Sequence, residues 1–192
     1  MSFMDIFDQE YAPILSQRSH TFGQIFMYLD SLNKDNYTIV ETGTTRIVDN
    51  FAGDGCSTVM FDRYVNSKNN GVVYTVDISP ESCQTARSLT SNKTIVVLGD
   101  SVSFLSKFPN PQDIDLLYLD SYDFDFNDPH PSSFHHLKEL TAVYAKLRPG
   151  CIIVVDDNFG GGIGKGTYVR DFLHNVGDIL CWDEYHLGFV KR

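Results

Sequence analysis

Long apolar runs, a secretory signal and paired cysteines are all missing from this sequence. No run of eighteen apolar residues occurs, so we expect no membrane-spanning helix. The N-terminal stretch MSFMDIFDQEYAPIL lacks a basic region followed by an apolar segment, and we therefore expect a cytoplasmic protein. The cysteines form no CxxC pair, which argues against a disulfide framework or a zinc site; they are Cys56, Cys83, Cys151 and Cys181.

Basic residues are also scarce. The chain has 15 lysines and arginines against 25 aspartates and glutamates, a formal net charge of -10. An acidic surface repels phosphate backbones, so we expect a small-molecule partner and no nucleic acid. The first glycine turn does not contain GxGxxG, which disfavours a nicotinamide-dependent dehydrogenase.

Short apolar runs alternate with stretches of helical spacing along most of the chain. The runs are rich in β-branched residues and nearly continuous, as in strands buried on both faces of a parallel sheet. They are Tyr37–Glu41, Val72–Ile78, Thr94–Leu98, Ile114–Leu119 and Cys151–Val155. The expected helices are Ser57–Asn66, Pro80–Leu89, Val102–Phe108, Pro131–Leu147 and Thr167–His174. This alternation predicts βαβ units with right-handed crossovers.

The two ends of the chain differ from this pattern. Residues 1–36 are expected to form a helical segment, a candidate cap over a substrate, before a domain spanning 37–192. The final stretch, DILCWDEYHLGFVKR, predicts an antiparallel hairpin. The predicted fold is therefore α/β and Rossmann-like: a seven-stranded, mostly parallel sheet with helices on both faces and a C-terminal antiparallel hairpin.

An acidic residue or a glycine turn lies at the carboxyl end of every predicted parallel strand. Open α/β sheets bind their ligands beyond these strand ends. The first strand leads into the turn Glu41-Thr42-Gly43-Thr44, where a glycine lets the backbone approach a ligand closely. The second ends at Asp77, placed to accept hydrogen bonds from ribose hydroxyls. Asp100 and Ser101 follow the third strand, Asp120 the fourth, and Asp156 and Asp157 the fifth.

These strand ends resemble those of class I S-adenosylmethionine-dependent methyltransferases, and most of all the group of catechol and macrocin-type sugar O-methyltransferases. The resemblance implies that Glu41 and Gly43 contact the methionine part of the cofactor, that Gly55 and Ser57 bind its carboxylate, and that Asp77 holds its ribose. It also places Asp100 and Ser101 beside the adenine. Thr44, Ile78 and Asp120 complete the predicted cofactor-binding set.

The same resemblance implies a Mg²⁺ site. Its relatives hold Mg²⁺ with an acid after the fourth strand and two adjacent residues after the fifth, which correspond here to Asp120, Asp156 and Asp157. A one-residue shift in register would instead give Asp157 and Asn158. Carboxylate oxygens suit Mg²⁺, which would bind substrate oxygens and lower the pKa of a hydroxyl. The alternative is that these acids only orient the substrate or cap the next segment.

The general base is left open by the sequence. Catechol-type relatives place a lysine three residues after the aspartate of the fourth strand, whereas Asp123 stands here. The histidines that follow, His130, His135 and His136, are the other candidates, because histidine titrates near neutrality. Each has the alternative of being a surface or packing residue.

Two loops depart from the expected pattern. Residues Ile47–Asp54 form an insertion between the glycine turn and the next helix, so that Gly53 or Gly55 takes over part of the loop's role. Gly160–Gly166 resembles a phosphate-binding loop but lies after the fifth strand. We expect a mobile loop over the acceptor, with Lys165 pairing with an anionic group; a plain connection is equally compatible.

The sequence thus predicts a methyltransferase that uses S-adenosylmethionine and Mg²⁺ to methylate a hydroxyl of a small metabolite such as a sugar or polyol. The alternative is a cofactor-binding domain of the same fold without catalysis. Whether the chain forms a homo-oligomer is left open.

Overall fold

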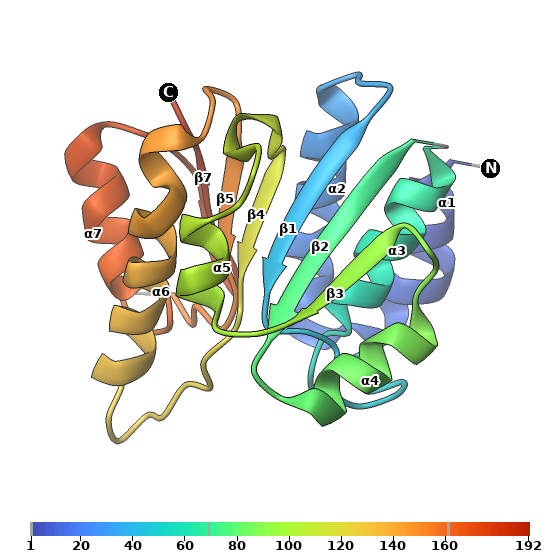
Figure 1. The fold of residues 1–192 in the computed structure, drawn as a ribbon, viewed down its shortest axis with the longest axis horizontal. Coiled ribbons are helices and arrows are strands. Elements are labelled where there is room, and N and C mark those ends of the chain that lie inside the picture. The colour runs from blue at the N-terminus through green and yellow to red at the C-terminus, as the bar shows by residue number, and fades with distance from the viewer. Residues whose placement is uncertain (1, 69, 161) are drawn as a thin grey trace.

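Seven strands form one twisted sheet in the order β3-β2-β1-β4-β5-β7-β6 in the computed structural model, which describes residues 2–68, 70–160 and 162–192 (Figure 1). The strands are β1 (Tyr37–Thr42), β2 (Gly71–Asp77), β3 (Thr94–Leu98), β4 (Leu116–Leu119), β5 (Ile152–Val155), β6 (Ile179–Asp183) and β7 (Leu187–Val190). The first five pair in parallel, and β7 is antiparallel to both β5 and β6. The predicted fold class and C-terminal hairpin are confirmed.

Helices cover both faces of the sheet, and each face has its own hydrophobic core. One layer is made by α1 (Phe3–Ile6), α2 (Ser19–Ser31), α3 (Ser57–Ser67) and α4 (Pro80–Leu89). The other is made by α5 (Ser101–Ser106), α6 (His130–Val143) and α7 (Thr167–Val176) (Figure 1). Within the described residues, no helix is long and apolar enough to cross a membrane.

Local capping sets where several helices begin. Ser79 caps α4 by accepting a hydrogen bond from the backbone N–H of Ser82 at 3.1 Å, with Pro80 in the first turn. Asp100 caps α5 in the same way through the N–H of Ser103 at 2.7 Å, so this helix begins one residue before the predicted Val102. The predicted helix Pro131–Leu147 ends as an α-helix at Val143 and continues as a short 3₁₀ turn, Tyr144–Lys146.

The N-terminal segment packs into the same core as the sheet. Between α1 and α2 it runs through short helical turns (Phe7–Tyr11, Ala12–Ile14 and Ser16–Arg18). Phe22 of α2 is fully buried, and its ring lies 6.0 Å from the ring of Tyr118 in β4 and 4.7 Å from that of His186. This segment therefore shares the hydrophobic core of residues 37–192, while its role as a cap over substrate remains a prediction.

A buried carboxylate links β1 to the helix that follows it. Glu41 has no exposed surface and accepts hydrogen bonds from Ser57 Oγ at 2.5 Å and Thr58 Oγ1 at 2.6 Å, in the first turn of α3. Burial raises the pKa of Glu41 to about 7, although the hydroxyl donors oppose this shift. Glu41 thus holds the start of α3 against the end of β1.

Replacing Phe22 with alanine should lower the free energy of unfolding by about 3–5 kcal/mol, because a large side chain is removed from a packed core. Met27→Ala on the same helix, where the native side chain is 54% exposed, should have a much smaller effect. Urea denaturation followed by circular dichroism measures both. Equal effects of the two substitutions would contradict a shared core.

Glu41→Gln should remove a pH dependence of stability. Between pH 4.5 and 7 the folded protein keeps the Glu41 proton that the unfolded chain releases, so wild-type stability should fall as the pH rises through this window. The shift corresponds to up to roughly 3 kcal/mol at about 1.4 kcal/mol per pKa unit. Unfolding free energies of both proteins at a series of pH values test this, and parallel pH profiles would refute it.

Candidate active site

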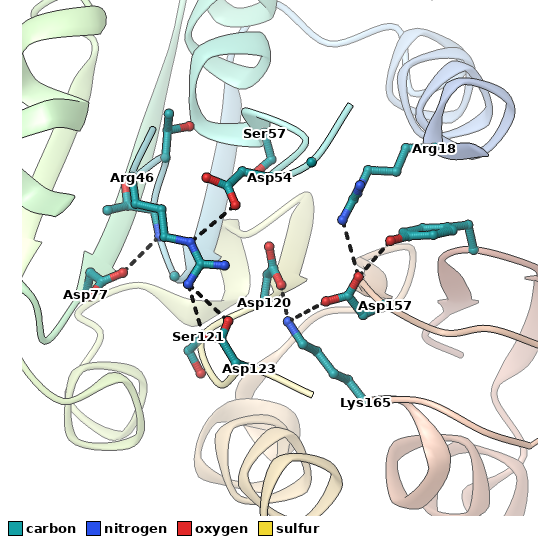
Figure 2. Close-up of a pocket in the computed structure, with 15 residues that line it drawn as sticks. Arg18, Arg46, Asp54, Ser57, Asp77, Asp120, Ser121, Asp123, Asp157 and Lys165 are labelled. Atoms are coloured by element: carbon teal, nitrogen blue, oxygen red, sulfur yellow. Dashed lines mark hydrogen bonds and ion pairs between the residues drawn. The ribbon is translucent and has the colours of Figure 1, made fainter. Parts of the chain in front are cut away.

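A cavity of about 180 Å³ opens at the carboxyl ends of β1 and β4, where the strand order reverses. Its lining comes from the N-terminal segment, the end of β2, the start of α3, the loops after β1, β4 and β5, and the C-terminal hairpin (Figure 2). The lining residues are Arg18, Gly43, Thr44, Thr45, Arg46, Gly53, Asp54, Ser57, Asp77, Asp120, Ser121, Asp123, Asp157, Lys165 and Tyr185.

Gly43 brings the β1 loop against the β4 loop. Its φ is +79°, and a Cβ atom at this position would lie 2.6 Å from the carbonyl oxygen of Asp120. A side chain is therefore excluded both by the left-handed backbone and by the close approach of the two loops. The predicted glycine turn is present and forms one wall of the cavity.

Asp77 links this cavity to a second one. Its carboxylate accepts hydrogen bonds from the backbone N–H of Thr44 at 3.2 Å and of Ser79 at 2.8 Å. The second cavity, of about 150 Å³, shares Asp77 and Ser121 with the first and is also lined by Val76, Ile78, Gly99, Asp100, Ser101, Tyr122 and His135. Ile78 is 75% exposed and offers an apolar surface there.

The insertion after β1 is a turn-rich loop tied to the N-terminal segment. The guanidinium of Arg18 donates to the carbonyl of Ala52 at 3.3 Å, and Phe51 packs against Tyr11 with ring centroids 5.6 Å apart. Gly53 lines the cavity, whereas Gly55 lies against the side chain of Arg18. The insertion thus supplies one glycine to the cavity wall.

A buried lysine lies at the acidic end of the cavity. Only 2% of Lys165 is exposed, and its ammonium group forms ion pairs with Asp120 and, at 3.0 Å, with Asp157 (Figure 2). Asp157 also accepts hydrogen bonds from Arg18 Nη2 at 3.2 Å and from the hydroxyl of Tyr185 at 2.8 Å. The predicted pairing of Lys165 with an anionic group is thus made to carboxylates of the protein itself.

Asp156 lies behind these residues and does not line the cavity. It is 1% exposed and pairs with Arg18 Nε at 3.5 Å and with His186 Nε2 at 3.2 Å. Asn158 points away, since its side-chain amide donates to Asp183 and to the carbonyl of Glu184. Of the alternatives for the pair after β5, only Asp157 reaches the cavity.

The cluster is electrostatically coupled. Burial alone would raise the pKa of Asp156, but His186, Arg18 and Lys165 hold it well below its usual range. Burial likewise works to lower the pKa of Lys165, yet the neighbouring carboxylates outweigh it and raise that pKa above the ordinary value. Lys165 therefore carries a fixed positive charge at neutral pH.

The four candidate general bases lie in four different places. Asp123 lines the first cavity, where two hydrogen bonds from Arg46, at 3.0 and 3.1 Å, lower its pKa. His135 lines the second cavity. His130 lies outside both, on an apolar groove with Tyr168. His136 is fully buried, and burial lowers its pKa to about 4.

A buried glutamate that the sequence did not single out organises the second cavity. Glu139 of α6 accepts hydrogen bonds from Ser121 Oγ at 2.6 Å and Thr42 Oγ1 at 3.1 Å, and lies 3.3 Å from His135 Nε2. Ser101 Oγ is 3.1 Å from the same histidine nitrogen. This network links His135 and Ser101, which line the second cavity, to Thr42 at the end of β1 and Ser121 after β4.

Arg18 and Tyr185 were also missed, because both reach the site from the ends of the chain. Arg18 stands in the polar stretch SQRSH of the N-terminal segment, with no local signal of burial. For Tyr185 the sequence did contain a signal, which is the predicted C-terminal hairpin. Once β7 pairs antiparallel to β5, Leu187 lies opposite Val155. The preceding residues, Tyr185 and His186, then lie beside Asp156 and Asp157.

The residues present do not fit a divalent cation as they stand. Asp120, Asp156 and Asp157 are each engaged by a positively charged or histidine side chain. Among the residues that the structure describes, no group of three or more His, Cys, Asp or Glu side chains is arranged to hold a metal ion. A metal would have to compete with Lys165 for the same oxygens.

The sequence matches the family model described as "Methyltransferase domain" over residues 52–158, more than half of the 192-residue chain. No curated protein matches it significantly. This chain therefore belongs to the methyltransferase domain family.

Solved structures share the fold at low sequence identity. The O-methyltransferase NovP superposes with a TM-score of 0.63 at 12% identity, covering 98% of each chain. SMU.1697c of Streptococcus mutans, solved in complex with SAH, gives 0.55 at 13% identity, covering 89% of this chain and 97% of its own. Precorrin-6y C5,15-methyltransferase of Geobacter metallireducens superposes with a TM-score of 0.54 at 12% identity, covering 85% of this chain and 83% of its own. With the family match, this shared fold identifies the chain as a class I S-adenosylmethionine-dependent methyltransferase.

Proposed function

We propose that the enzyme methylates a hydroxyl oxygen of a small metabolite, such as a sugar or polyol. The observation that carries this proposal is the pair of cavities joined at Asp77 and Ser121. The second cavity offers an apolar and hydroxyl-bearing lining for a nucleoside, and the first cavity offers fixed charges for a polar acceptor. A net charge of -10 supports a small acceptor over a nucleic acid.

The residues of the second cavity suit the nucleoside part of S-adenosylmethionine. Asp77 is placed to accept hydrogen bonds from the ribose hydroxyls, and Ile78 to cover one face of the adenine. Asp100 and Ser101 lie beside that position, and Thr44 and Ser57 line the adjoining cavity on the side of the methionine group. Glu41 is buried beneath Ser57, so its contribution is to position that residue.

The acidic end of the first cavity suits the acceptor. S-adenosylmethionine supplies an electrophilic methyl group, which an acceptor oxygen attacks in line with the departing sulfur. In this proposal the proton of the acceptor hydroxyl goes to the Asp120 carboxylate and the oxygen lone pair forms the new O–CH₃ bond. The electron pair of the broken S–CH₃ bond stays on sulfur. No step is assigned to Mg²⁺, because Lys165 and Arg18 already engage its predicted ligands.

Replacing Asp77 with alanine should weaken binding of S-adenosylhomocysteine by about 100-fold, the loss expected for hydrogen bonds to a charged acceptor. Asp171→Ala, which removes an exposed carboxylate from α7, is the matched control and should bind normally. Isothermal titration calorimetry measures both. Unchanged affinity in Asp77→Ala would contradict the assignment of the ribose site.

Asp120→Asn should separate catalysis from cofactor binding. We expect turnover to fall by roughly 10²–10⁴-fold, the usual contribution of general acid–base catalysis, while affinity for S-adenosylhomocysteine changes little. Release of S-adenosylhomocysteine is measured with a panel of hydroxylated metabolites, again with Asp171→Ala as control. Cofactor binding without turnover on any acceptor would instead favour the non-catalytic binding domain.

A further inference from the structure

We propose that the ammonium group of Lys165 takes the place of a divalent cation in this site and itself binds the acceptor oxygen. The role in acceptor binding rests on the proposed O-methyl transfer. The replacement of the cation does not depend on that reaction and rests on the contacts of Lys165 and its neighbours. The first observation is its position between Asp120 and Asp157, two carboxylates from neighbouring strand ends that the sequence had predicted as metal ligands (Figure 2).

The backbone of the loop after β5 holds Lys165 in this position. The N–H of Lys165 donates to the carbonyl of Asp157 at 3.1 Å, and Gly164 forms a bridge with Asn158. Gly164 has a φ of +136°, and a Cβ there would lie 2.5 Å from the Asp157 carbonyl oxygen. Ser133 of α6 donates to the Gly164 carbonyl at 2.9 Å. The described part of the glycine-rich loop is thus folded back on the end of β5; Gly161 lies outside the described residues.

The backbone at the end of β5 also supports the pairing of Asp157 with Lys165. Asp157 adopts a φ of +46°, a left-handed conformation that is uncommon for a residue other than glycine. This turn directs Asp156 back toward Arg18 and His186, while Asp157 lines the cavity beside Lys165. A backbone conformation of this kind persists only where the surrounding contacts maintain it, and here they are the ion pairs of Asp157 with Arg18 and Lys165 and the hydrogen bond from the Lys165 N–H to its carbonyl.

The charge balance of the cluster leaves little attraction for a second cation. Arg18 and Lys165 neutralise two of the three clustered aspartates, of which Asp156 is buried and the other two are partly exposed, and His186 also contacts Asp156. A divalent ion between Asp120 and Asp157 would lie against the ammonium group, where like charges in a buried site repel strongly. Mg²⁺ also requires octahedral geometry and open carboxylate oxygens. Its binding would require Lys165 to leave.

An ammonium group also suits the proposed chemistry. It has three N–H donors, and among the described contacts Asp120 and Asp157 take two of them. The third is available to an oxygen of the acceptor at the end of the cavity that Lys165 lines. Lys165 would then orient this oxygen next to Asp120, which removes its proton.

The test measures metal binding directly, by Mn²⁺ electron paramagnetic resonance and calorimetry on protein stripped with EDTA. The wild type should bind Mn²⁺ only weakly, with a dissociation constant above about 1 mM, the weak end of protein sites for hard cations, because Lys165 already neutralises Asp120 and Asp157. Lys165→Ala should bind Mn²⁺ at least tenfold more tightly, because Asp120 and Asp157 lose their cation. Lys165→Met also removes the charge but keeps the side-chain volume, and it should show the same gain in Mn²⁺ affinity. It replaces the alanine variant in the test if that variant is unstable.

Lys146→Ala, which removes an exposed lysine remote from the cavity, is the matched control and should behave as the wild type. Tight, stoichiometric Mn²⁺ binding by the wild type that is lost in Asp120→Asn would overturn the inference. So would the absence of any gain in both Lys165 variants.

Methyl transfer is measured separately, with and without EDTA. Turnover that requires Mg²⁺ would leave the proposed function intact and overturn the role of Lys165. Conversely, no turnover on any acceptor would refute the proposed function, whereas the Mn²⁺ measurements would still decide whether Lys165 replaces the metal.

Discussion

The structure depends on the neutralisation of three aspartates at the ends of β4 and β5. Asp120, Asp156 and Asp157 lie close together in a site that is largely closed to solvent, and such charges persist only when they are paired and hydrogen-bonded. Their partners come from three separate parts of the chain: Arg18 before α2, Lys165 in the loop after β5, and Tyr185 and His186 in the hairpin. The ion pairs therefore tie both termini to the centre of the sheet.

This arrangement gives the site its rigidity more than its stability. Buried ion pairs gain roughly as much as desolvation costs, but removing one partner leaves an uncompensated charge. Packing around the cluster supplies the stability, since Phe22 contacts both Tyr118 and His186 in the core beneath it. The charged groups are held where the hydrophobic core places them.

The parts of the fold that depend on local sequence were predicted well. The β-branched runs are strands, the helix expected at Pro80–Leu89 has those bounds, and the final residues form the antiparallel hairpin. Strand ends in a parallel sheet meet at one edge, so the strand pattern alone was enough to place Gly43, Asp77 and Asp120 at one site. Glu139 could not be placed in this way, because nothing in its neighbourhood distinguishes a buried glutamate from an exposed one on an amphipathic helix.

The sequence by itself determined the α/β order of elements, the glycine turn after β1 and the acids at the strand ends, because these follow from periodicity and turn chemistry over short stretches. Only the tertiary structure decided what the acids are bound to. Lys165 is separated from Asp120 by 45 positions and Arg18 from Asp157 by 139, so no local pattern connects them. They meet because the sheet brings distant strand ends to one edge, where the clustered carboxylates of Asp120, Asp156 and Asp157 pair with cationic side chains.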